Sequence, residues 1–216
     1  MGRDERRIVG DLVGAHGQTY ADEAGIRLKN TPQPLYRLLV LAHLLSARIG
    51  APIAVAAARA LSEAGLRDPR RMAGADWQQR VDALGRGGYR RYDERTATQL
   101  GEGAELLTER WGGDLRKLRD EADGEVSDER RLLQEFPGVG PTGADIFLRE
   151  AQSVWPEAAP YLDRKALQGA ERLGLPDDPD RLLSLAGTTE PAVLAAALVR
   201  AAVDKDVAED ALHHAA

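Results

Sequence analysis

Apolar side chains recur at helical spacing over most of the chain, and no stretch of useful length alternates as a strand would. Prolines and glycines mark the breaks between these stretches, with Pro34 and Pro52 at helix starts and Gly65 and Gly112 at helix ends. The expected helices cover residues 4–16, 34–49, 52–64, 75–84, 93–110, 127–135, 143–153, 163–174 and 190–212, with shorter ones from residue 68, over 114–122 and over 177–184. The pattern therefore predicts an all-α protein.

One short segment, FPGVGPTGA, separates two of these helices and begins at Phe136. Gly138 and Gly140 can adopt positive φ at little cost, so a sharp turn is expected there. Pro141 has no N–H to lose, which suits the first turn of a helix. Backbone amides at such a turn bind anions, and phosphate is the natural occupant. Taken alone, the segment is equally consistent with a helix end followed by a Gly-Pro turn.

The composition is that of an ordinary globular protein, at 43% hydrophobic and 30% charged residues. Aromatic residues make up only 5%, while alanine, leucine, arginine and glutamate dominate, which favours helix over sheet. No apolar stretch is long and uncharged enough to span a bilayer, and the N-terminal sequence lacks the apolar core of a signal peptide. We therefore expect a cytoplasmic protein without a membrane partner.

The chain contains no cysteine, which excludes disulfides, thiolate zinc sites and cysteine-ligated iron–sulfur clusters. With only four histidines, no structural metal site is expected either. The net charge of −6 argues against non-specific binding to polyanions. Positive charge is nevertheless concentrated, at Arg86, Arg90, Arg91 and Arg95 and again at Arg164 and Lys165. Each cluster fits a solvated helix face as well as a DNA-binding surface.

The segment FPGVGPTGA resembles the helix-hairpin-helix of the endonuclease III superfamily of DNA glycosylases, in which Leu-Pro-Gly-Val-Gly precedes a helix. Leu44–Arg48 is similar to the Leu-Leu-Ser-Ala-Gln segment of that family, and Tyr92–Arg95 to its Tyr-x-x-Lys/Arg step into a helix. Asp163 stands where the family keeps its catalytic aspartate. The resemblance covers roughly residues 34–175.

This resemblance implies a two-lobed helix-hairpin-helix glycosylase fold with a central helical barrel. The barrel lobe is expected over 34–154, and the second lobe over 1–33 with 155–216, carrying Asp163. The implied function is DNA repair: a glycosylase of base-excision repair that binds double-stranded DNA with a damaged base and hydrolyses the N-glycosidic bond of that flipped base. We expect a monomer associated with the nucleoid. The alternative is a helix-hairpin-helix DNA-binding protein that has lost catalysis.

Asp163 precedes a predicted helix, a position where aspartate is favoured as the N-cap. The resemblance implies that its carboxylate activates water or stabilises an oxocarbenium-like sugar, and an N-cap is compatible with either role. A carboxylate that opens into a pocket wide enough for a base would favour the enzyme. A carboxylate that is buried or only caps a helix would favour the alternative.

Bifunctional relatives attack the sugar with a lysine just after the hairpin, where this chain has Thr142. Threonine cannot form a Schiff base, so water attack without a lyase step is expected. The cysteines that hold an iron–sulfur cluster in many relatives are missing. No cofactor is therefore expected beyond a monovalent cation held by hairpin carbonyls.

The resemblance also implies roles for other residues. Arg48 takes the place of the glutamine that fills the gap left by the flipped base, although a solvent-facing arginine is an equal alternative. His43, Tyr89 and Tyr92 are candidates for the base pocket, and the tyrosines fit half-buried packing as well. The expected DNA-binding residues are Pro137, Gly138, Val139, Gly140, Thr142, Arg48, Arg164 and Lys165.

Overall fold

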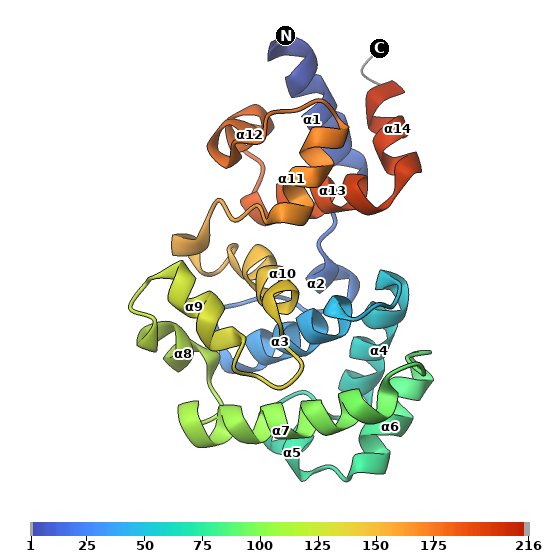
Figure 1. Ribbon diagram of the computed structural model, residues 1–216, viewed down its shortest axis with the longest axis vertical. Helices are drawn as coiled ribbons and strands as arrows, with labels where there is room; N and C mark the ends of the chain where they lie inside the picture. The colour runs from blue at the N-terminus through green and yellow to red at the C-terminus, as the bar shows by residue number, and fades with distance from the viewer. Residues whose placement is uncertain (1, 214–216) are drawn as a thin grey trace. The chain divides into compact units, whose positions relative to one another are not determined.

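The computed structural model describes residues 2–213, and these fold into helices without a strand (Figure 1). The prediction of an all-α protein is confirmed. The chain divides into two compact units. We call Ala21–Leu148 the hairpin unit, and Met1–Tyr20 together with Arg149–Ala216 the aspartate unit.

The hairpin unit is built around α3, whose side chains from Leu35 to Leu44 are almost all buried. Helix α3 ends at Ser46, earlier than predicted, because Ala47 has an extended backbone (φ −72°, ψ 160°). Arg48 therefore lies outside the helix. The helices of this unit are α2 (Tyr20–Glu23), α3 (Pro32–Ser46), α4 (Ala51–Glu63), α5 (Pro69–Gly74), α6 (Trp77–Arg86), α7 (Asp93–Trp111), α8 (Leu115–Glu121), α9 (Val126–Leu133) and α10 (Pro141–Ala151), with the unit boundaries inside α2 and α10.

The aspartate unit packs its helices around α13, an alanine-rich helix that is mostly buried. Gly169 allows the close approach of α11, since a Cβ there would overlap the carbonyl of Leu198. The prediction of one helix over 190–212 is wrong: the backbone is extended at Asp204, whose carboxylate accepts the N–H of Asp206 at 2.9 Å. The helices are α1 (Gly2–His16), η1 (Pro156–Ala158), α11 (Arg164–Arg172), α12 (Pro179–Ala186), α13 (Pro191–Val203) and α14 (Lys205–His213).

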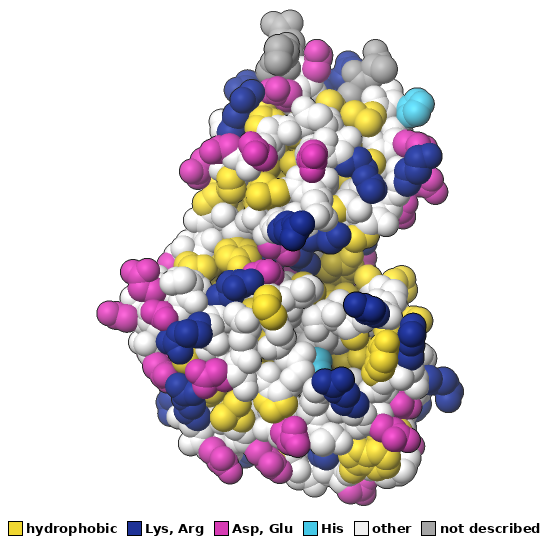
Figure 2. Space-filling model, in the orientation of Figure 1, with side chains coloured by type: hydrophobic (Ala, Val, Ile, Leu, Met, Phe, Trp, Pro, Cys, Tyr) yellow, Lys and Arg dark blue, Asp and Glu magenta, His cyan; other side chains and the backbone are white. Residues whose placement is uncertain are grey.

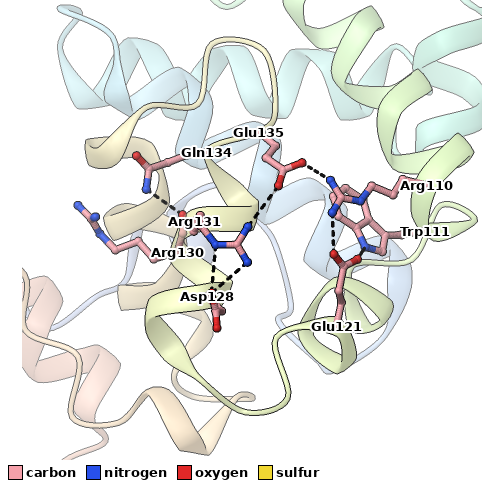
Figure 3. Close-up of polar contacts among 8 residues, drawn as sticks. All are labelled: Arg110, Trp111, Glu121, Asp128, Arg130, Arg131, Gln134 and Glu135. Carbon is pink, nitrogen blue, oxygen red and sulfur yellow. Dashed lines mark hydrogen bonds and ion pairs between the residues drawn. The ribbon is translucent and has the colours of Figure 1, made fainter.

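A polar network at the end of α7 fixes the chain that enters the hairpin (Figure 3). Arg110 binds both Glu121 and Glu135, and the Trp111 Nε1–H donates to Glu121 at 2.7 Å. The ring of Trp111 also stacks on Phe136, with centroids 5.6 Å apart. The residues just before the turn are therefore held by charge and by an aromatic contact.

Within residues 2–213, no single helix is long and apolar enough to cross a membrane. Helices α12 and α13 pass that test only as a pair bent by 104°. The described residues also contain no group of three or more histidine, aspartate or glutamate side chains that could hold a metal ion.

Candidate functional site

The turn between α9 and α10 is tight, and one of its two candidate glycines has the left-handed conformation. Gly138 has φ +81°, and the Val139 N–H donates to the Phe136 carbonyl at 3.0 Å. Gly140 does not have positive φ, so only one of the two glycines uses the conformational freedom that the sequence offered. Its carbonyl accepts the Ala144 N–H at 3.0 Å, which makes Gly140 the N-cap of α10, a position that uses extended backbone.

Parts of this turn face solvent, as an anion site requires. Gly138, Gly140 and Thr142 are exposed, whereas Val139 is buried and its N–H is already used inside the turn. The N–H of Thr142 belongs to the first turn of α10, where amides have no partner within the helix and carry the positive end of its dipole. The amide of Val139 is therefore not available to a phosphate, while the exposed residues Gly138, Gly140 and Thr142 lie on either side of it.

A pocket of about 360 Å³ opens beside this turn, entirely within the hairpin unit. It combines the end of α3, the loop before α7, the first two turns of α7 and the hairpin. Its lining residues are His43, Ser46, Ala47, Arg48, Tyr89, Tyr92, Arg95, Thr96, Gln99 and Gly138. The candidate base-pocket residues His43, Tyr89 and Tyr92 thus meet Arg48 and the hairpin at one place.

The hairpin contacts the floor of this pocket directly. A Cβ on Gly138 would lie 2.5 Å from both His43 Nε2 and Gln99 Oε1. Burial lowers the pKa of His43 to about 4, a hydrogen bond with Gln99 opposes that shift, and the charge of Arg95 adds to it. His43 is therefore neutral at pH 7 and can both donate and accept a hydrogen bond.

The two tyrosines of the pocket have different surroundings. Tyr89 is buried, its hydroxyl lies 3.2 Å from Thr96 Oγ1, and burial raises the pKa of its phenol. Tyr92 is half-buried, and the Arg91 guanidinium lies 5.3 Å from its ring centroid. Tyr89 thus forms part of the wall, while Tyr92 presents part of its ring to solvent.

Asp163 lies in the aspartate unit, where each of its carboxylate oxygens already accepts one hydrogen bond. It is the N-cap of α11: Oδ1 accepts the Ala166 N–H at 2.9 Å, and Oδ2 pairs with Arg149 Nη1 at 2.7 Å. The side chains of Asp163 and Arg149 are only 7% and 3% exposed. The predicted N-cap is present, and the carboxylate is buried rather than open.

No protein-family model and no curated protein sequence matches the chain. Among solved structures, a trapped covalent intermediate of endonuclease III with DNA, an estranged-adenine complex, is similar with a TM-score of 0.54. The match covers 93% of this chain and 85% of that one at 17% identity. The chain has the endonuclease III fold. The predicted fold class is therefore confirmed. The chain has this fold although its sequence contains no cysteine.

In this version of the endonuclease III fold, the remaining predicted residues are distributed over both units. Arg48 is exposed at the pocket, and Pro137 is half-buried at the start of the turn. Arg164 and Lys165 are exposed in the first turn of α11, in the aspartate unit and outside the lining of the pocket.

Sequence reasoning missed several residues that the structure places at these sites. Gln99 and Arg149 are the main ones. Gln99 lies one turn after Arg95 on the same face of α7. The helical spacing of Tyr92, Arg95 and Gln99 is visible in the sequence and could have indicated that the three side chains lie together. Arg149 directly follows the apolar run Ile146–Leu148. An arginine at such a position is expected to be buried, and a buried arginine requires an acidic partner.

Proposed function

We propose that this protein binds duplex DNA through its hairpin, takes one extruded base into the pocket of the hairpin unit, and acts as a DNA glycosylase. The observation that carries the proposal is the pocket itself: about 360 Å³ of space, bounded by Arg48, Tyr92 and Gly138. Enzymes that act on a base must take it out of the stack and hold it by stacking and hydrogen bonds. The endonuclease III fold agrees with this function.

The pocket has the chemistry that a nucleobase requires. Its volume lies within the range of small-ligand sites. Tyr92 offers a π-face for stacking, and the uncharged His43 and the amide of Gln99 offer donors and acceptors for the edge of a base. The phosphate of the extruded nucleotide would meet the exposed amides at the start of α10.

Hydrolysis in this proposal uses water and Asp163. Water adds to the sugar C1′ as the bond to the base breaks, and the proton that the water loses ends on the departing base. The carboxylate stabilises the positive charge that develops on the sugar ring. Each carboxylate oxygen accepts one hydrogen bond in this structure, so a lone pair remains on each. Thr142 cannot form a Schiff base, so the strand stays intact.

A second candidate, a DNA-binding protein without catalysis, is favoured by the surroundings of Asp163. The carboxylate is buried, caps α11 and is neutralised by Arg149, all of which suit a structural role. Under this alternative the hairpin and the pocket bind an extruded base that is not released.

A panel of duplexes with single lesions separates the two candidates. The glycosylase proposal expects base release from at least one lesion, read as strand cleavage after hot alkali, and little covalent adduct with borohydride. Asp163→Asn should lower base release by roughly 10²–10³-fold, while the affinity for the same duplex is retained.

Three outcomes would contradict parts of this proposal. Tight binding of lesion duplexes with no base release from any of them supports the second candidate. Full activity of a folded Asp163→Asn variant removes the catalytic role of this carboxylate. Efficient borohydride trapping of the unmodified protein contradicts water attack.

A further inference from the structure

Five arginines are exposed at and beside the pocket, and none forms an ion pair within the described residues. They are Arg48, Arg86, Arg90, Arg91 and Arg95. Figure 2 shows Lys and Arg side chains gathered on the right of the lower part of the molecule, where α7 begins in Figure 1. This part of an otherwise acidic chain is therefore positively charged.

Two acidic residues, Asp93 and Glu94, begin α7 between these arginines. The Asp93 carboxylate accepts the Glu94 N–H at 2.9 Å, so it is directed at the helix terminus that it stabilises. Over residues 85–95 the balance is four arginines against two acids, and Arg48 adds a further positive charge. The surface keeps a positive charge at neutral pH.

The loop that carries Arg90 and Arg91 is held firmly against the unit. A Cβ on Gly87 would overlap the backbone of Ala57 in α4, so the loop touches that helix directly. The Tyr89 N–H donates to the Leu84 carbonyl at 3.0 Å, and the Tyr89 ring is buried. The arginines therefore extend from a fixed base, which reduces the entropy lost when they bind a ligand.

From these observations we infer a second DNA-contacting surface, formed by Arg90, Arg91 and Arg95, which binds the backbone phosphates that flank the base held in the pocket. Arg95 lines the pocket, and Arg90 and Arg91 lie in the chain between Tyr89 and Tyr92, which also line it. The backbone of a nucleotide extruded into this pocket therefore passes close to these arginines. Arginine binds phosphate oxygens through two parallel N–H groups. The inference rests on the proposed function and adds a set of contacts that is separate from the hairpin.

The dependence of affinity on salt tests this surface. The probe is a fluorescent duplex with one tetrahydrofuran abasic analogue, titrated between roughly 50 and 200 mM salt, where each phosphate contact contributes about 0.9 to the slope of log K against log salt. The double variant Arg90→Gln/Arg91→Gln should bind more weakly and lose about 1.8 from that slope. Arg91→Lys, which keeps the charge, should retain the slope.

Arg70→Gln is the control, because Arg70 is exposed and its replacement removes one positive charge, half of what the double variant loses. Its neighbour Pro69 lies by Gly113, just after the C-terminal end of α7. Helix α7 has 19 residues and is about 28 Å long, so Arg70 is far from the arginines at the N-terminal end of that helix. This control should leave the slope unchanged. If the double variant behaves like Arg70→Gln while Gly138→Ala weakens binding, the inferred phosphate contacts of the arginines are contradicted. The proposed function is not contradicted by that result. An unmodified protein that does not bind the duplex overturns both.

Neutral phosphates locate the contacts on the DNA. Methylphosphonates placed next to the tetrahydrofuran should weaken binding of the unmodified protein and have little further effect on the double variant, because the same contact is already lost. Equal losses in both proteins would show that the arginines contact the DNA elsewhere and would contradict the inference. Circular dichroism and thermal melting establish that each variant is folded.

Discussion

The pocket of the hairpin unit and the carboxylate of the aspartate unit differ in how far their polar groups are already satisfied. Arg48 and Arg95 line the pocket, face solvent and have no ion-pair partner in the described chain. Asp163 is buried and has one strong partner on each oxygen. The open site therefore keeps the unsatisfied polar groups that a ligand could use, while the closed site has a structural task whether or not it also has a catalytic one.

The largest expected effect concerns the closed site. Arg149→Met should destabilise the protein by about 3–5 kcal/mol, because the Asp163 carboxylate would stay buried without its ion partner. Adding Asp163→Asn should restore most of that loss, since asparagine still caps α11 and carries no charge. Urea unfolding of both single variants and the double variant gives the coupling energy.

The control for this pair is Arg131→Met, which breaks exposed ion pairs with Asp128 (3.0 Å) and Glu135 (3.7 Å; Figure 3). Exposed pairs contribute roughly 0–1 kcal/mol, so the control should change stability little. If Arg149→Met and Arg131→Met lose the same unfolding free energy, the buried Arg149–Asp163 pair does not stabilise the protein more than an exposed pair.

The next effect is a pH dependence at the floor of the open site. Unfolded His43 binds a proton near pH 6.5, but folded His43 does so only near pH 4. Stability from this residue is therefore fully present above pH 6.5 and is lost as pH falls to about 4, by about 3 kcal/mol in total. His43→Gln should remove this part of the acid sensitivity, measured as the difference in unfolding free energy between pH 7 and pH 5. An unchanged difference would contradict the burial of a neutral imidazole.

The smallest effect distinguishes the hairpin glycines. Gly138→Ala should cost about 1–3 kcal/mol, because φ is positive and the new Cβ would press on His43 and Gln99. Gly25→Ala, with φ +66° and nothing within 4 Å, should show the backbone strain alone, about 1 kcal/mol. Gly140→Ala, with neither feature, should stay within about 0.5 kcal/mol. Equal losses at 138 and 140 would contradict this order.

Much of the fold could be predicted because the helices depend on local rules. Apolar spacing, prolines at helix starts and glycines at ends are all visible in a single chain, and the Asp163 N-cap follows from residue type. The failures are also local. The extended backbone at Asp204 divides a predicted helix, and the N-cap position of Gly140 excludes the positive φ that glycine permits.

The sequence by itself determined most of the helices, the hairpin motif, the absence of thiol chemistry and the candidate residues for both sites. Only the tertiary structure decided which of these residues meet. His43, Tyr89 and Gly138 come together because α3, the loop before α7 and the hairpin pack against one another, and no local pattern encodes that contact. Likewise, whether Asp163 is open or closed depended on Arg149, 14 residues away, because a buried charge requires a partner.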